Sequence, residues 1–200
     1  DYTDGIALQT IKLVFQYLEK SVLTGDPEAR EKIHNASTMA GMAFANAFLG
    51  MSHSMAHKIG GRFHTVHGRT NAILLPYVIR YNGTRPSKTT TWPKYNYWKA
   101  DEKFQDIARM LGLPHSTPEE AVAAYAKAVY ELGEKVGIKM NFKDQGIDEQ
   151  EWKKYTHELA LLAYEDQCSP ANPRLPMVAD MEEIMNDAYY GYKERPGRIK

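Results

Sequence analysis

The sequence predicts an all-α protein, with residues 1–200 forming one helical domain. Apolar residues recur at three- and four-residue spacings through most of the chain, which is the period of an amphipathic helix. No stretch of four to eight residues alternates apolar and polar side chains with the β-branched enrichment of a strand. Clusters of Gly, Pro, Asp and Thr separate the periodic stretches, as expected for turns between helices.

Two long helices are expected at the start of the chain. Residues 4–23 carry apolar side chains at helical spacing, and the pattern ends before Asp26. Asp26 is a favourable N-cap and Pro27 suits the first helical position, so the next helix is expected from there to about residue 50. Its second half, MAGMAFANAFLGM, is rich in Ala and Gly and is expected to be fully buried.

A histidine-rich segment follows, and breaks in helical structure are expected near it. A turn is expected at Gly60-Gly61, and an apolar helix over 71–81 is expected to be interrupted at Pro76. Residues 82–97 are polar, contain Pro and aromatic residues, and predict a long surface loop of the kind used in function or assembly.

The second half of the chain predicts four more helices. They are expected over residues 99–111, 117–136, 148–165 and 179–192. A polar tail with four basic residues follows and is expected to be solvated.

Composition restricts the class of partner. Lys and Arg together number 25, as do Asp and Glu, so the formal net charge is zero and neither nucleic acid nor an anionic membrane is expected as a partner. No apolar run reaches the ~18 residues of a membrane span. Cys168 is the one cysteine, which excludes an internal disulfide and fits a reducing cytoplasm.

Four of the seven histidines lie in SHSMAHKIGGRFHTVHG, residues 52–68. His53 and His57 are four residues apart, so on a helix they project from one face, and a turn can return His67 to them. A metal ion could then accept His53 and His67 while His57 lies alongside. Ser54 stands where the HExxH motif of zinc proteases has its glutamate, so the cluster forms half a metal site.

The other histidines and the cysteine are expected to have structural roles. A single histidine on a helix is more often a hydrogen-bonded structural residue than a ligand, and no role is assigned to the histidines outside the cluster or to His64. Glu31 and His34 form an ExxH pair of the di-iron type, but the second pair that such a fold needs is missing. Cys168 is expected to be a small buried hydrophobe.

At this cluster the chain resembles a known family. The segment GMAFANAFLGMSHSMAHKIGGRFHTVHGRTNAILLPYVIRYN resembles the signature of the iron-containing (group III) alcohol dehydrogenases, with H-x3-H-x9-H-G followed by N-A-I-L-L-P. The later CSPANPR, residues 168–174, is similar to a second segment of that family. Within the family, the loop from residue 87 onwards is similar to the alcohol dehydrogenase half of bifunctional aldehyde–alcohol dehydrogenases.

The resemblance implies a fold and a set of roles. It implies the helical C-terminal domain (dehydroquinate synthase-like) that follows an NAD-binding α/β domain, with the chain beginning partway into the helical domain. His53 and His67 then correspond to the last two of three histidine ligands of Fe²⁺, with Zn²⁺ as the alternative occupant. His57 corresponds to the non-ligand histidine beside nicotinamide and substrate, where it would be the catalytic proton relay. The remaining Asp and His ligands are expected upstream of Asp1.

The implied activity is NAD-dependent reduction of acetaldehyde to ethanol, as part of a bifunctional enzyme. Its partners would be a small alcohol or aldehyde, the remaining domains of the same polypeptide, and further copies in a homo-oligomer or filament. Two alternatives stay open: a single-activity dehydrogenase of this family for another small alcohol or diol, and an assembly module without activity. Phe48, Leu49 and Phe63 are expected as pocket walls, although core packing explains them equally well.

Overall fold

The computed structural model describes residues 1–86 and 98–191, and over these residues it contains helices and no strand. This confirms the predicted all-α class. The helices are α1 (Tyr2–Thr24), α2 (Pro27–Ala47), α3 (Met51–Phe63), α4 (His67–Gly83), α5 (Ala100–Met110), α6 (Pro118–Lys135), α7 (Glu149–Tyr164), the short 3₁₀ helix η2 (Ser169–Ala171) and α8 (Val178–Tyr190).

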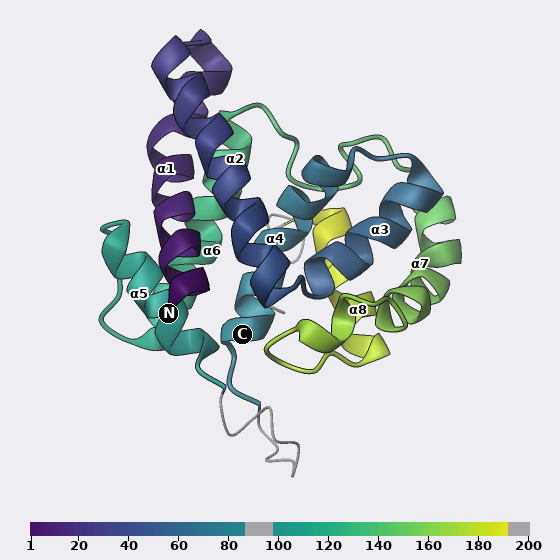
Figure 1. Cartoon of the computed structure of the whole chain (residues 1–200). Coiled ribbons are helices and arrows are strands. Elements are labelled where there is room, and N and C mark those ends of the chain that lie inside the picture. Colours follow the sequence, from purple (N-terminus) through teal and green to yellow (C-terminus); the bar gives the residue numbers. More distant parts are fainter. Residues whose placement is uncertain (87–97, 192–200) are drawn as a thin grey trace.

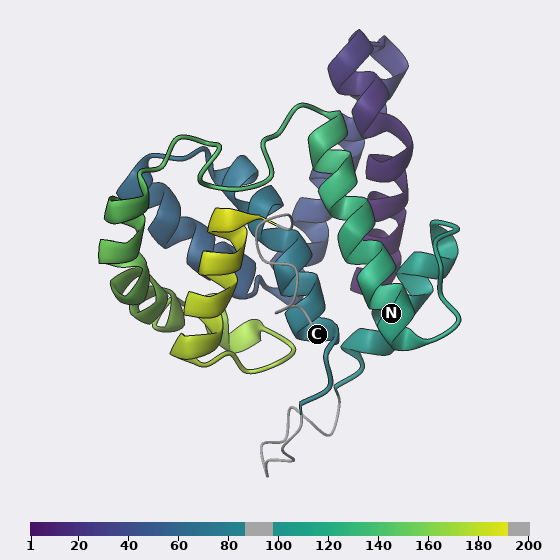
Figure 2. The same cartoon turned by 180° about the vertical axis from the view of Figure 1, so that it is seen from behind.

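Helix α4 lies in the middle of the molecule, between two groups of helices (Figures 1 and 2). On one side, α1 and α2 form a long antiparallel hairpin that projects beyond the rest of the fold, and α5 and α6 pack beside it. On the other side lie α3, α7 and α8, with α7 contacting both α3 and α8. Because α4 contacts α3, α5, α6 and α8, it joins the two groups.

Each group has its own apolar cluster. The larger surrounds Trp152 of α7, which is fully buried and stacks between Phe142 and Tyr189 with ring centres 5.2 and 4.9 Å away. The smaller lies between α4, α5 and α6. Its buried members are Ile79, Ile107, Val122, Tyr125 and Ala126.

Capping residues fix the starts of several helices where the sequence predicts them. The Asp26 carboxylate accepts a hydrogen bond from the Ala29 amide at 2.9 Å, which satisfies a free donor of the first turn of α2. Thr117 caps α6 in the same way, accepting from the Glu120 amide at 3.2 Å. The predicted helices over 4–23, 99–111, 117–136, 148–165 and 179–192 are confirmed to within a few residues at their ends.

The predicted breaks around the histidine segment are wrong. Helix α3 continues through Gly60-Gly61 to Phe63, and the chain turns at His64, which has the left-handed φ of 56°. Helix α4 continues through Pro76, which is buried in its interior. Packing of α4 on both sides offsets the backbone hydrogen bond that proline cannot donate.

The prediction that the second half of α2 is fully buried is also wrong. Met42 and Phe44 are each 47% exposed, and Phe48, just after the helix, is 56% exposed. Helix α2 packs mainly on α1, and no described helix covers its other side. Ala43 is buried, whereas Ala45 and Ala47 are exposed, so burial in this half of α2 is confined to one face.

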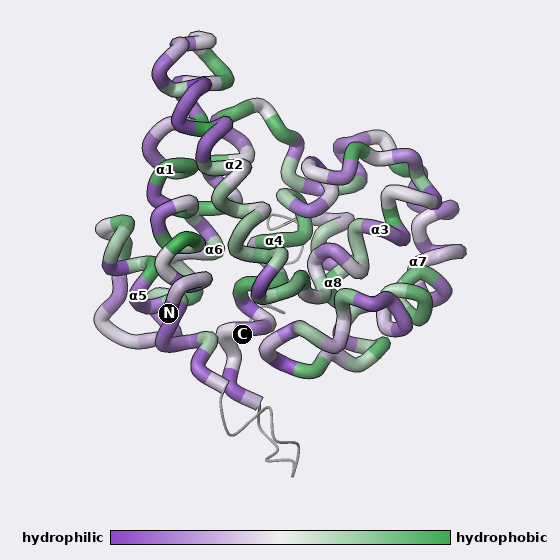
Figure 3. The backbone as a smooth tube through the Cα atoms, in the orientation of Figure 1, coloured by the Kyte–Doolittle hydropathy of each residue, from purple (hydrophilic) through white to green (hydrophobic). Residues whose placement is uncertain are grey.

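The remaining sequence predictions on this scale concern the loop and the membrane. Residues 87–97 of the predicted surface loop, and the basic tail over 192–200, lie outside the described residues. Over the described part of the chain, every helix is too short or too polar to cross a bilayer, and the hydropathy along each one is mixed (Figure 3).

Candidate metal and catalytic centre

The structure brings the three predicted histidines together from two helices. His53 and His57 project from α3, and His67 is the first residue of α4. The ring centres of His53 and His67 are 5.3 Å apart, and His57 stacks on His67 with centres 5.4 Å apart and an interplanar angle of 16°. His53 and His57, one helical turn apart, meet edge to face at 6.2 Å.

A short elbow between α3 and α4 makes this meeting possible. His64 adopts the left-handed conformation that ends many helices, so the chain reverses within three residues. The Thr70 hydroxyl donates to the Val66 carbonyl at 3.0 Å and lies 2.6 Å from the Thr65 hydroxyl, which fixes the start of α4 against the elbow. His64 itself is exposed and takes no part in the cluster.

The spacing of His53 and His67 fits two ligands of one metal ion. An ion about 2.1 Å from one nitrogen of each ring, at a tetrahedral angle, places the ring centres roughly 5 Å apart. Burial lowers the pKa of His53, and the neighbouring His67 and His57 lower it further, which favours the neutral imidazole that binds metals. Two such donors would be half of a tetrahedral set.

A hydrogen-bonded chain orients His67. The Ser52 hydroxyl donates to Oδ1 of Asn71 at 3.0 Å, and Nδ2 of Asn71 lies 3.2 Å from Nε2 of His67. Because the amide nitrogen can only donate, Nε2 of His67 carries a lone pair. That lone pair accepts the Asn71 amide here, so a metal ion bound at Nε2 would replace this hydrogen bond.

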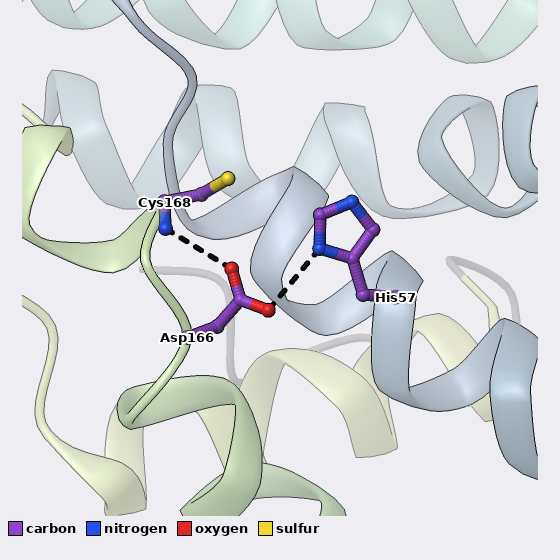
Figure 4. Close-up of side chains that lie close together, drawn as sticks. All are labelled: His57, Asp166 and Cys168. Carbon is purple, nitrogen blue, oxygen red and sulfur yellow. Dashed lines mark hydrogen bonds and ion pairs between the residues drawn. The ribbon is translucent and has the colours of Figure 1, made fainter.

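The ring of His57 contacts Asp166, a residue that follows α7 (Figure 4). Nδ1 of His57 lies 3.2 Å from Oδ2 of Asp166, and the Lys58 ammonium lies 2.9 Å from the same oxygen. Oδ1 of Asp166 accepts from the Cys168 amide at 3.0 Å. Burial acts to raise the pKa of Asp166, but the hydrogen bonds from Cys168, Lys58 and His57 outweigh it and hold the pKa well below its usual range.

His57, Asp166 and Cys168 also place three potential ligand atoms within 4.8 Å of one another. The Lys58 ammonium contacts the carboxylate oxygen that a cation would bind, so these groups form a hydrogen-bonded network rather than a second metal site. Burial raises the pKa of the Cys168 thiol, and its hydrogen bond to Asp166 raises it further, so the thiol stays protonated. Cys168 is buried, as predicted.

The CSPANPR segment supports the start of the histidine-bearing helix. Asn172 is buried, and its Oδ1 accepts from the Met51 amide at 3.2 Å and from Asn82 at 3.3 Å. Its Nδ2 donates to Asn82 at 2.7 Å and to the Arg174 carbonyl at 2.6 Å. The sequence singles out this segment by resemblance but does not reveal this role, because the partners lie 90 and 121 residues away.

The other residues considered in the sequence have simple surroundings. Phe63 stacks on Trp152 and belongs to the core, whereas Phe48 is exposed. Glu31 and His34 are exposed. Nδ1 of His157 pairs with Glu182 at 2.8 Å on the surface.

An all-helical fold that gathers imidazoles from two helices beside a buried carboxylate defines a helical domain with a candidate metal and catalytic centre. The chain belongs to the Fe-containing alcohol dehydrogenase family, whose C-terminal domain matches residues 1–189. This confirms the resemblance seen in the sequence.

Individual relatives place the chain within that family. It is 79% identical over 200 residues to an aldehyde-alcohol dehydrogenase of Streptococcus pneumoniae, covering 100% of the chain and 23% of that protein. It is 41% identical over 198 residues to a bifunctional aldehyde-alcohol dehydrogenase of Escherichia coli, covering 96% of the chain and 22% of that protein. The chain thus spans less than a quarter of these relatives.

Among solved structures, a 1,3-propanediol oxidoreductase superposes with a TM-score of 0.81 at 32% identity. The match covers 94% of this chain and 46% of the other. The helical architecture therefore corresponds to about half of a solved dehydrogenase.

Proposed function

We propose that residues 1–200 form the metal-binding helical domain of an NAD- and iron-dependent alcohol dehydrogenase that reduces acetaldehyde to ethanol within a bifunctional enzyme. The observation that carries the proposal is the meeting of His53 and His67 at 5.3 Å with His57 stacked against His67. The 79% identity to an aldehyde-alcohol dehydrogenase supports the choice of substrate and of the second activity.

In this proposal two of the three histidines bind the metal and the third transfers a proton. His53 and His67 would hold Fe²⁺, with Zn²⁺ as the alternative, together with further ligands. The ion, when bound, supplies a Lewis acid that polarises the aldehyde carbonyl toward hydride from NADH. His57 lies beside the ligand pair, where its Nε2 can hold a proton for the oxygen that becomes the alcohol. Its place beside the nicotinamide would also make it a cofactor contact.

Metal analysis of the complete enzyme, combined with NADH oxidation on acetaldehyde, tests the proposal. His53→Ala and His67→Ala should each abolish iron retention and alcohol dehydrogenase activity. His57→Ala should keep the metal and slow turnover by ~100-fold, as expected for loss of a positioned proton-transfer group. A His57→Ala enzyme without iron, or a His53→Ala enzyme with full iron content, would contradict these roles.

A single-activity dehydrogenase for a small diol is the second candidate. The match to a 1,3-propanediol oxidoreductase favours it. Comparison of kcat/KM for acetaldehyde with that for 3-hydroxypropanal decides between the two candidates. A higher value for acetaldehyde supports the bifunctional enzyme, and a higher value for 3-hydroxypropanal supports the diol dehydrogenase.

The proposal extends to the surroundings of the enzyme. The partners would be the other domains of the same polypeptide and further copies in a homo-oligomer or filament, and the location would be the cytoplasm. One cysteine in 200 residues, free and buried, is compatible with a reducing compartment.

A further inference from the structure

We propose that Asp166 is a positioning residue that fixes the ring orientation of His57 and keeps the ring hydrogen on Nδ1. The inference rests on the proposed function, because it takes His57 as the group that transfers the proton. It assigns Asp166 no contact with substrate or metal. Asp166 is 109 residues from His57 in the sequence, and folding alone brings the two together.

The carboxylate of Asp166 is a fixed reference point. Its side chain is 8% exposed and receives hydrogen bonds from three directions. Oδ1 accepts from the amide of Cys168, the residue before η2, and Oδ2 accepts from Lys58 and His57. A carboxylate held at both oxygens cannot rotate freely. The position of the imidazole is therefore fixed relative to the segment before η2.

The direction of the bond to His57 follows from the charge of Asp166. The hydrogen bonds that lower its pKa keep the carboxylate ionised, and an ionised carboxylate can only accept. The hydrogen therefore lies on Nδ1 of His57. In a singly protonated ring, the lone pair then lies on Nε2, at the opposite edge of the ring (Figure 4).

Lys58 also holds the Asp166 carboxylate in place next to His57. It neighbours His57 on α3, and its ammonium lies 2.9 Å from Oδ2, so the negative charge is balanced inside the cluster. Both contacts come from the same turn of α3, and together they attach that turn to the segment after α7. The His57 side chain is about one third exposed, and rotation of its ring would break the contact with Asp166.

Asp166→Asn in the complete enzyme tests the inference with little change of shape. The new Oδ1 can still accept from the Cys168 amide, but an NH₂ group replaces Oδ2 and can only donate. It would donate to Nδ1 of His57, so Nδ1 could no longer carry a hydrogen. The ring could then not hold hydrogens on both nitrogens in this orientation, as the proton donor of the reduction must. We expect kcat to fall about 100-fold, with KM for aldehyde and NADH changed less than about threefold. Iron content, measured by elemental analysis, should stay at the wild-type level.

A double-mutant cycle separates positioning from a general structural role. Once His57 is alanine, Asp166 has nothing to orient, so His57→Ala with Asp166→Asn should match His57→Ala alone within about twofold. A further loss in the double variant, or wild-type kcat in Asp166→Asn, would overturn the inference. Wild-type turnover in His57→Ala would instead overturn the proposed function, so the two failures can be told apart.

The surface pair of His157 and Glu182 provides a matched control. It has the same chemistry, with Nδ1 lying 2.8 Å from a carboxylate oxygen, but it joins α7 and α8 away from the histidine cluster. Glu182→Gln should leave kcat, KM and iron content unchanged. A loss of kcat equal to that of Asp166→Asn would mean that any such pair affects turnover through stability, against the inference.

Discussion

A single amide, Asn172, connects three distant parts of the chain at the base of the candidate centre. It receives the first amide of α3, exchanges hydrogen bonds with Asn82 at the end of α4, and donates to the Arg174 carbonyl. All its hydrogen-bonding capacity is used inside the protein, where an unsatisfied polar group costs about 1–3 kcal/mol. The start of the histidine-bearing helix is thus defined by one fully bonded side chain.

Gly50→Ala should therefore destabilise the protein. A Cβ at Gly50 would lie 2.7 Å from Oδ1 of Asn172, which is buried and cannot move without breaking its bonds. We expect a loss of about 1–3 kcal/mol, seen as a lower midpoint of thermal unfolding followed by circular dichroism. Gly61→Ala in exposed space on α3 is the control and should stabilise by about 0.5–1 kcal/mol. Equal midpoints for the two variants would contradict the role of Asn172.

At the scale of the elements, the connection between α2 and α3 is strained. Phe48 has φ 68° and ψ 179°, a region that is essentially restricted to glycine, and its ring is mostly exposed. The Phe48 amide donates to the Phe44 carbonyl at 2.7 Å, and two residues later Gly50 begins the approach to α3. The strain is located five residues before His53, at the entry to the candidate centre.

Phe48→Gly should relieve this strain and raise stability by about 1 kcal/mol, because glycine adopts the conformation without steric conflict. The measurement is the urea concentration at half-unfolding. Phe44→Gly, within α2, is the opposite control and should lower stability by about 1 kcal/mol, since glycine disfavours a helix interior. A lower midpoint for Phe48→Gly would show that the contacts of the ring outweigh the backbone strain.

Local patterns predict the elements well and their breaks poorly. Apolar spacing with the caps Asp26 and Thr117 is enough to place the helices, because these signals lie within a few residues of each other. The continuation of α3 through Gly60-Gly61 and of α4 through Pro76 depends on packing with distant helices, which spacing does not contain.

The same distinction holds within the site. His53, His57 and His67 are close in sequence, and their proximity is predictable from a helix and a turn. Asp166 is not predictable in this way, because its contact with His57 depends on the docking of α7 against α3. The one available signal is that Asp166 lies two residues before the CSPANPR segment.

At the scale of the whole molecule, α4 belongs to both apolar clusters. Ile73 and Leu74 pack into the larger cluster around Trp152, while Ile79 packs into the smaller cluster with α5 and α6. One rigid helix therefore contributes a face to each side of the fold. Loss of either cluster should loosen α4 and through it the other cluster.

Ile79→Ala should accordingly weaken both sides. Deletion of this buried side chain should destabilise the fold by about 2–5 kcal/mol. Hydrogen exchange with mass spectrometry should show lower protection in α7 as well as in α6, although α7 does not contact Ile79 within the smaller cluster. Leu75→Ala, at a partly exposed position on the same helix, should change little. Unchanged protection of α7 would indicate two independent units.

The elbow between α3 and α4 has a consequence for how the enzyme would acquire its ion. The spacing of the two donor rings is set by hydroxyl contacts and by the packed core of the chain itself. Chelating groups that are preorganised in this way lose little freedom on capturing a cation. If His53 and His67 hold the ion as proposed, binding it would require little rearrangement of α3 and α4.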